Sequence, residues 1–316
     1  MSNSSKKPKK SPSATRGRKS KSTPGAILGV AAARKPKPVE PITNLIVVSD
    51  LHCGCRLGLC PPKVSLDDNA TYGHTTIQAD IWKRWEEFWG EWVPMVCRGE
   101  PYSVVLNGDA VDGKHHNAVT QISQNLTDQA RIAKIVMKPV VEACEGRYYH
   151  LRGTESHVGS SGQDEERLAE ELGAIPDGEG RFARWEMWIE VGCGLVHLSH
   201  HIGTASSMAY ETTAVQKEME QSFVEAARWG NRHPDVIVRS HRHRNVETRI
   251  QTAHGFATAC TTAGWQAKTP FVYKIVGGRQ TLPQIGGTLV RSGDEDMFTR
   301  HKLWNLGRPK TERPMA

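Results

Sequence analysis

The stretch Asn44-Leu-Ile-Val-Val-Ser-Asp-Leu-His52 joins a compact apolar run to two potential metal ligands. Residues 44–48 are typical of a buried β-strand, and Asp50 and His52 follow that strand directly. The same arrangement recurs along the chain. Apolar runs near residues 103–106, 148–151, 194–199 and 235–239 are followed, in that order, by Asp109 and Asp112, Glu155 and His157, His200 and His201, and His241 and His243.

These five clusters are expected to lie close together in the folded chain. In an α/β sheet, residues beyond the carboxyl ends of the strands converge on one crevice. Carboxylate and imidazole groups bind hard to borderline divalent cations, and one carboxylate can bridge two of them. A single cluster would indicate only a turn or a surface histidine. Five clusters in order, each at the end of a strand, predict a site for two divalent metal ions.

Helical periodicity separates the predicted strands. Five aromatic residues between positions 78 and 93 recur at spacings of three and four, which predicts a helix packed against a sheet through Trp82, Trp85, Phe88, Trp89 and Trp92. Further helices are predicted near residues 118–144, 165–172 and 209–229, and an irregular loop at 53–77. More strands are predicted at residues 184–191, 245–251, 254–260, 271–276 and 286–291. This alternation favours an α/β fold.

The positive charge of the chain is concentrated at its beginning. Residues 1–40 contain 11 Lys or Arg and one acid, a net of +10, which leaves −3 for the rest of a chain whose total is +7. This segment is rich in Ser, Lys and Pro, so we expect a disordered basic tail. It is either a solvated tail or an arm with weak nucleic-acid contact. Residues 43–306 are expected to form the folded domain, and residues 307–316 a short C-terminal tail.

The apolar residues and the cysteines exclude several classes of protein. No window approaches 18 uninterrupted apolar residues, and the N-terminus lacks the apolar stretch of a secretory signal. We therefore expect a cytoplasmic protein without membrane contact. The odd number of cysteines, seven, indicates free thiols. Cys53, Cys55 and Cys60 have no adjacent fourth ligand, which argues against a structural zinc site.

Taken in order, the five clusters resemble the motifs of the calcineurin-like metallophosphoesterases. That family carries D-x-H, G-D-x-x-D, G-N-H-D/E, a histidine at a strand end, and G-H-x-H. The corresponding segments here are Asp50-Leu-His52, Gly108-Asp109-Ala-Val-Asp112, Gly153-Thr-Glu-Ser-His157, Leu198-Ser-His200-His201 and Ser240-His241-Arg-His243. The resemblance spans about residues 43–292. It implies a four-layer sandwich in which mixed β-sheets are flanked by helices.

The resemblance also implies a ligand for each metal position. Its first metal would be held by Asp50, His52 and His243. The second would be held by His200 and His241, with Asp109 bridging both metals. Two positions stay open or peripheral: His201 is an alternative to His200, and Asp112 corresponds to a residue that more often lies behind the ligands.

The third motif departs from the family pattern, because Thr154 and Glu155 stand where the family has Asn and His. Either Glu155 supplies the missing oxygen ligand and His157 is the catalytic histidine, or the loop supports only one tightly bound metal. We favour the first interpretation. Arg152 corresponds to an arginine that grips the phosphate in serine/threonine protein phosphatases, and a guanidinium suits two parallel hydrogen bonds to phosphate oxygens.

These features predict metal-dependent hydrolysis of a phosphate ester by a metal-activated water, with two ions of manganese, iron or zinc as cofactors. His157 would stabilise or protonate the leaving oxygen. Arg152 favours a monoester, so that the partner would be a phosphorylated protein or small molecule. The alternatives are a phosphodiesterase or nuclease acting on nucleic acid, and a non-catalytic protein that binds metal and DNA.

Overall fold

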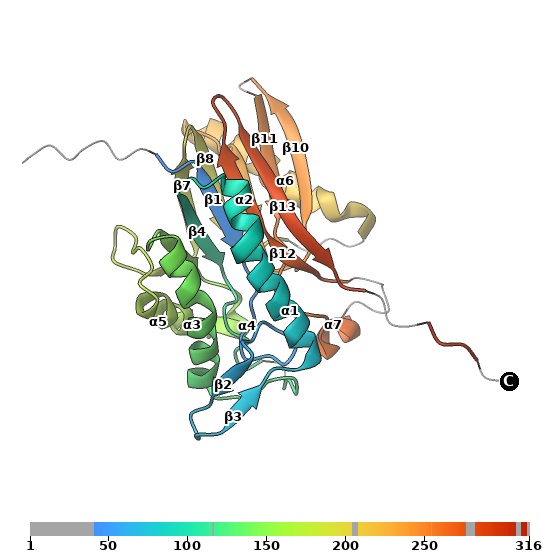
Figure 1. Cartoon of the computed structure of the whole chain (residues 1–316). Helices are drawn as coiled ribbons and strands as arrows, with labels where there is room; N and C mark the ends of the chain where they lie inside the picture. Colours follow the sequence, from blue (N-terminus) through green and yellow to red (C-terminus); the bar gives the residue numbers. More distant parts are fainter. Residues whose placement is uncertain are drawn as a thin grey trace, which may run out of the picture. The chain divides into compact units, whose positions relative to one another are not determined.

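Two β-sheets pack face to face, and helices cover the outer side of each (Figure 1). The computed structural model describes residues 41–115, 117–203, 208–253, 255–275, 282–307 and 311–314. The predicted basic tail, residues 1–40, and its predicted nucleic-acid contact lie outside the described residues. So do residues 308–310 and 315–316 of the predicted C-terminal tail.

The larger sheet has six strands in the order β13-β12-β1-β4-β5-β6. β1 (Asn44–Val48) lies inside this sheet, and each of its residues is buried. The strands β1, β4 (Tyr102–Asn107), β5 (Tyr148–Leu151) and β6 (Ala183–Arg184) run parallel to one another. On the other side of β1, β12 (Gln284–Ser292) pairs antiparallel with β1, and β13 (Met297–Asn305) pairs antiparallel with β12. Because parallel strands end at the same edge, the segments that follow β1, β4 and β5 meet there.

The smaller sheet has five strands in the order β10-β11-β9-β8-β7. Its three inner strands run parallel and its two edge strands pair antiparallel with them. The strands are β7 (Glu186–Val191), β8 (Gly194–Ser199), β9 (Val236–Arg239), β10 (Val246–Thr252) and β11 (Gly255–Thr261). The ends of β8 and β9 therefore deliver His200 and His241 to the same end of the sandwich. A separate hairpin, β2 (Lys63–Ser65) and β3 (Thr71–Gly73), lies within the loop predicted at residues 53–77.

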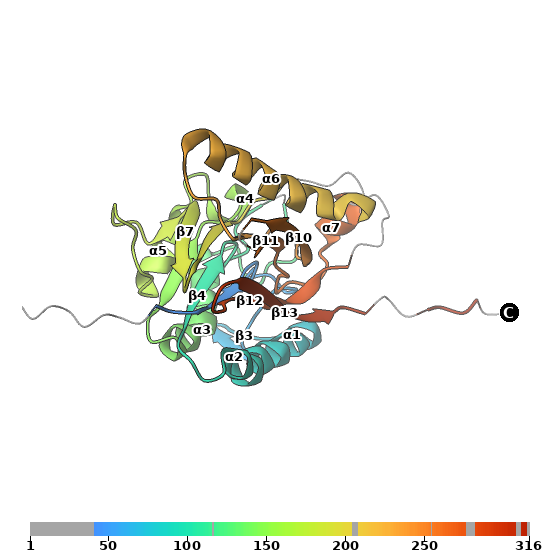
Figure 2. The ribbon, with the colours of Figure 1, turned by 90° about the horizontal axis from the view of Figure 1, so that it is seen from above.

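Three hydrophobic clusters fill the spaces between the layers. The cluster between the sheets includes Leu45 and Val105 from the larger sheet and Val196 and Val238 from the smaller one. The outer side of the larger sheet packs against α1 (Thr76–Glu87), α2 (Val93–Cys97), α3 (Leu126–Ala143) and α5 (Gln163–Glu171). The outer side of the smaller sheet packs against α6 (Glu211–Trp229), which follows the short η2 (Met208–Tyr210). Figure 2 shows α6 on one side of the sheets and α1, α2 and α3 on the other, which confirms the predicted four-layer sandwich.

The helix predicted at residues 78–93 is present and is longer than expected. It continues from α1 through a π-helical turn, η1 (Phe88–Trp92), into α2. Thr75 Oγ1 accepts a hydrogen bond from Gln78 N at 3.2 Å and Gln78 Oε1 accepts one from Thr75 N at 3.0 Å, a capping box that fixes the first turn. Phe88 is fully buried against the larger sheet, which confirms that the aromatic face belongs to the core.

Two predicted elements differ in the structure, and one strand was missed. The helix predicted at residues 118–144 begins only at Leu126, because Asn125 Oδ1 accepts a hydrogen bond from Thr127 N and caps it there. The strand predicted at residues 271–276 is the helix α7 (Pro270–Ile275), whose first residue is a proline, as is common at helix starts. β13 was not predicted, because most of its residues are only half-buried and form no apolar run.

All seven cysteines are free and only Cys193 is exposed, which confirms the prediction of free thiols. Burial raises the pKa of Cys55 to about 11 and that of Cys60 to about 12. Within the described residues, no cysteine belongs to a group that could hold a metal. No helix in the described part of the chain is long and apolar enough to cross a membrane.

Candidate metal centre

Side chains that follow four different strands meet at one end of the sandwich. They form two groups of three, and within each group the potential ligand atoms lie within 4.8 Å of one another. The first group is Asp50, His52 and His243, and the second is Asp109, His200 and His241. His200 Nε2 lies 3.8 Å from Asp50 Oδ1, so the two groups are adjacent.

The first group has the arrangement of a cation site. Asp50 Oδ1 lies 3.2 Å from His243 Nε2 and 4.0 Å from His52 Nε2, and the two imidazole nitrogens are 3.2 Å apart. Asp50 Oδ1 is buried and has no hydrogen-bond partner among the described residues. A cation bound by all three atoms would satisfy this oxygen and both imidazoles at once, so these residues fit a divalent metal.

In the second group, His200 is held with one nitrogen toward the carboxylates. Its Nδ1 lies 2.7 Å from the carbonyl oxygen of Asn107, so Nδ1 carries a proton that it donates to this oxygen. Its Nε2 lies 3.1 Å from Asp109 Oδ2. A hydrogen bond of this kind fixes the ring of metal-binding histidines. Of the two histidines considered for this position, His200 is fully buried and belongs to the second group. His201 is exposed and belongs to neither group.

The charges of the two groups shift their pKa values strongly. Burial acts to raise the pKa of Asp50, but His243 and His200 outweigh it and hold this pKa well below its usual range. Burial acts to lower the pKa of His200, but Asp109 and Asp50 raise it to about 10. The pKa of His241 falls to about 4 because of burial and the nearby charge of His200. A buried cluster of ionised carboxylates therefore stabilises positive charge at this position.

Asp112 contacts the first group and also belongs to a further candidate group with His115 and His157. Its Oδ1 is 3.3 Å from His52 Nδ1, so it can accept the proton on that nitrogen and leave His52 Nε2 facing Asp50. Gln266 Nε2 donates to the same carboxylate at 3.3 Å. Carboxylates commonly orient metal-binding histidines in this way. Gln266 and the neighbouring His115, whose Nε2 is 3.5 Å from Asp112 Oδ2, were not predicted as part of the site.

The backbone at the centre is held in an unusual conformation. Asp50, His52, Asp109, His241 and His243 all have positive φ, with values of 55°, 45°, 55°, 70° and 50°. Such values cost free energy for residues other than glycine, and they concentrate at functional sites where surrounding contacts maintain them. Ser240, which replaces the family's glycine, is not among the described residues with positive φ, so a side chain is tolerated there.

The third motif places Thr154 at the centre, and it leaves Glu155, the predicted ligand, outside the candidate metal groups of the described residues. Thr154 Oγ1 lies 3.1 Å from Asp109 Oδ2, 3.3 Å from His200 Nε2 and 3.1 Å from His241 Nδ1. Its N–H also donates to Asp109 Oδ1 at 2.7 Å. Glu155 is exposed as the first residue of α4 (Glu155–Val158) and belongs to none of the metal groups found among the described residues.

This geometry predicts opposite results for two adjacent substitutions. Thr154→Ala should weaken binding of the metal at the second group by about tenfold, because it removes a hydroxyl that contacts all three ligands. Glu155→Ala should leave metal binding unchanged. Elemental analysis of the dialysed variants measures this, with Thr154→Ser as the variant that retains the hydroxyl. Loss of metal from Glu155→Ala but not from Thr154→Ala would restore the original interpretation.

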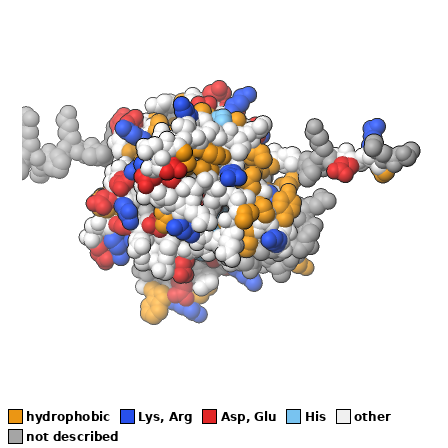
Figure 3. All heavy atoms as spheres, turned by 90° about the horizontal axis from the view of Figure 1, so that it is seen from below, with side chains coloured by type: hydrophobic (Ala, Val, Ile, Leu, Met, Phe, Trp, Pro, Cys, Tyr) orange, Lys and Arg blue, Asp and Glu red, His pale blue; other side chains and the backbone are white. Residues whose placement is uncertain are grey.

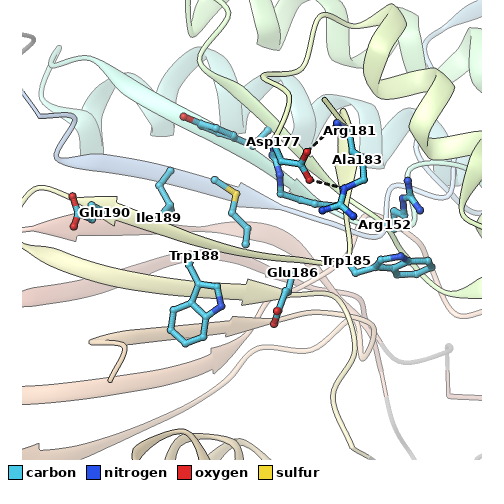
Figure 4. A pocket seen from close by; sticks show the side chains of 12 residues that line it. Arg152, Asp177, Arg181, Ala183, Trp185, Glu186, Trp188, Ile189 and Glu190 are labelled. Atoms are coloured by element: carbon cyan, nitrogen blue, oxygen red, sulfur yellow. Dashed lines mark hydrogen bonds and ion pairs between the residues drawn. The ribbon is translucent and has the colours of Figure 1, made fainter. Parts of the chain in front are cut away.

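The structure also places Arg152 away from the metal centre. Its Nη2 is 2.9 Å from Glu166 Oε2 and its Nη1 donates to the carbonyl oxygen of Ser161 at 3.0 Å. The guanidinium lies 5.2 Å from the centre of the Trp185 ring, in a pocket beside β6 and β7 that Figure 4 shows. The Nη1 and Nη2 atoms of Arg152, which was predicted to bind the phosphate, are thus engaged by Ser161 and Glu166, and this residue does not line the cavity at the metal centre.

His157 does lie at the centre. Its Nδ1 is 2.6 Å from the carbonyl oxygen of Asp112, and its ring packs edge-on against that of His52 with the centroids 4.5 Å apart. It forms a further group with His52 and Asp109 within the same 4.8 Å limit. Burial lowers its pKa, although the charge of Asp109 opposes this effect. A largely neutral imidazole thus borders both metal groups.

The sequence matches no protein-family model and no curated protein. Solved structures that are similar to the chain include Vps29 from Chaetomium thermophilum, with 10% identity over 84% of this chain and 100% of that chain and a TM-score of 0.36. They also include the sulfate thiohydrolase SoxB from Thermus thermophilus, with 12% identity over 86% of this chain and 58% of that chain and a TM-score of 0.37. A metallophosphoesterase from Sphaerobacter thermophilus has 8% identity over 84% of this chain and 89% of that chain, with a TM-score of 0.36. These similarities are low, and the assignment of a function rests on the residues of the metal centre.

Proposed function

We propose that this chain is a metallophosphoesterase of the calcineurin-like type, which hydrolyses a phosphate ester at a centre of two divalent metal ions. The observation that carries the proposal is the position of Asp109. Its carboxylate forms one potential metal group with His200 and His241, and it also lies within 4.8 Å of a ring nitrogen of His52 from the first group. A carboxylate shared in this way suits the bridging position of a centre with two metals.

The reaction would be a direct transfer to water. Divalent ions at this centre would lower the pKa of a bound water and neutralise phosphate oxygens. The water oxygen forms a bond to phosphorus, the bond from phosphorus to the leaving oxygen breaks, and the leaving oxygen takes up a proton. The chain supplies fixed ligands, since Asp112 orients His52 and the carbonyl oxygen of Asn107 orients His200.

His157 is proposed as the residue that assists the leaving oxygen. Its hydrogen bond to the carbonyl oxygen of Asp112 fixes the ring, and the side chain lines the cavity at the metal centre. An imidazole at this position can stabilise the leaving oxygen or transfer a proton to it.

The preference for a monoester loses its main support, because Arg152 pairs with Glu166 outside the cavity. Without that arginine, monoester and diester hydrolysis are equally compatible with the metal centre. The competing function is metal binding without catalysis. The two functions are distinguished by whether the protein hydrolyses a phosphate ester.

Removal of metal provides the direct test. We expect activity on a chromogenic phosphate ester to fall at least about tenfold after treatment with a chelator, and to return when Mn²⁺ is added, because no other group of the centre can activate water comparably. The assay uses 4-nitrophenyl phosphate and bis(4-nitrophenyl) phosphate, with protein dialysed without chelator as the control.

Full activity after exhaustive removal of metal would contradict the proposed mechanism. Tight binding of Mn²⁺ without hydrolysis of either ester would instead favour the non-catalytic alternative.

A further inference from the structure

The metal centre opens into a cavity of about 400 Å³. Its polar lining includes His52, Asp109 and His157 of the centre. Its apolar lining consists of Ala118, Val119, Pro270, Phe271 and Val272, which we call the apolar wall. Figure 3 shows the molecule from below, the end toward which β1 and β4 run in Figure 1, and hydrophobic side chains gather on that face.

The apolar wall is connected to the metal centre through the segment that precedes α7. Trp265 N donates to the carbonyl oxygen of Asp50 at 2.9 Å, and Gln266 Nε2 donates to Asp112 Oδ1 at 3.3 Å. At the start of α7, Thr269 Oγ1 accepts a hydrogen bond from Val272 N at 3.3 Å. Because this segment is bonded to Asp50 and Asp112, it holds Pro270, Phe271 and Val272 beside the candidate ligands.

Apart from the proposed metal ions, the described residues of the cavity offer little positive charge to a phosphate. Lys274 is the one Lys or Arg side chain among the described residues that line it. No arginine from that part of the chain is available for the paired hydrogen bonds that terminal phosphate oxygens favour. In a diester, one of these oxygens is esterified and carries no charge, and its organic group can lie against an apolar surface.

We propose, on the basis of the proposed function, that the substrate is a phosphodiester with a flat aromatic group, such as a nucleobase, that packs against the apolar wall. Phe271 is 37% exposed and can contribute its ring to such a contact. The cavity volume lies near the lower end of the range for sites that hold small ligands. It suits one nucleotide-sized group beside the scissile phosphate.

Two diesters, one with a nucleoside and one with a methyl group as the second ester group, test the proposal. Thymidine 5′-(4-nitrophenyl) phosphate and methyl 4-nitrophenyl phosphate share a leaving group, and the wild type should prefer the first by about tenfold in kcat/KM. Phe271→Ala should lower this ratio to about threefold or less. Tyr273→Ala is the matched control, because Tyr273 lies on the same helix but does not line the cavity. It should leave the ratio unchanged.

A binding measurement separates the failure of this inference from the failure of the proposed function. Calorimetry with Mn²⁺ present compares thymidine 5′-monophosphate with 2-deoxyribose 5-phosphate in the wild type and in Phe271→Ala. Binding that depends on the base and on Phe271, without turnover of any ester, would retain the apolar wall and refute the hydrolase. Hydrolysis of both diesters at equal rates, or faster hydrolysis of 4-nitrophenyl phosphate than of either, would refute the inference and retain the hydrolase.

Discussion

Replacement of Asp109 by Asn is expected to reduce kcat about a thousandfold, equivalent to roughly 4 kcal/mol of transition-state stabilisation. The amide keeps the shape of the side chain but removes the negative charge. Asp109 is 1% exposed, and its Oδ2 lies 3.1 Å from His200 Nε2, so solvent cannot replace that charge. Turnover and metal content measured on the same preparation should therefore fall together.

An exposed carboxylate provides the control for this substitution. Asp294→Asn removes the same charge from an exposed loop between β12 and β13 and should leave turnover and metal content unchanged. The thermal unfolding of both variants shows whether the fold is retained. If Asp109→Asn kept two metals per chain and more than about a tenth of the wild-type rate, Asp109 would not be the bridge.

Much of the site could be predicted because each ligand follows a strand in an alternating or buried pattern. In β8, Val196 and Leu198 are buried whereas His197 and Ser199 are half-buried, so His200 continues the buried positions. This alternation would have separated His200 from His201 without the structure. The positions of most strands could be predicted because apolar runs are recognisable, whereas the order of the strands in the two sheets came from the structure.

The contacts of Arg152 and Glu155 could not be predicted from their positions in the motif. Arg152 pairs with Glu166, a residue of α5 whose carboxylate also accepts hydrogen bonds from Phe182 N and Ala183 N. That partner is 14 residues away and becomes a neighbour only when α5 packs beside β6. Glu155 is the first residue of the helix α4, and its side chain is exposed. The position at which a helix starts is predicted from sequence only to within one or two residues.

The apolar wall shows a similar effect of local sequence. The segment Phe271-Val-Tyr273 has the composition of a strand, and it was predicted as one. Pro270 lacks a backbone N–H, which favours the first position of a helix, and Thr269 Oγ1 accepts a hydrogen bond from the following turn. Folding this segment as α7 brings Phe271 to the cavity, which is how an error in secondary structure concealed a potential substrate contact.

Gly153→Ala is expected to reduce turnover about a hundredfold, because a methyl group at this position cannot coexist with Asp109. A Cβ there would collide with Asp109 Oδ1 and the Asp109 backbone nitrogen, and would lie 2.8 Å from its Cγ. The loop cannot retreat easily, since Gly153 N donates to the buried Glu165 at 2.6 Å and Ala110 N donates to the same carboxylate at 2.8 Å. Overpacking of this kind typically costs about 1–3 kcal/mol of stability.

The cause of the expected loss is steric, since Gly153 is not among the described residues with positive φ and alanine can adopt its backbone conformation. Gly90→Ala is the matched control, because a Cβ at that exposed helical position meets no atom within 4 Å. It should preserve activity and stabilise the fold by roughly 0.5–1 kcal/mol. Elemental analysis, turnover and thermal unfolding are measured on both variants. A Gly153→Ala protein with normal metal content and rate would mean that the loop moves freely, and the placement of Asp109 between the two metals would then have to be abandoned.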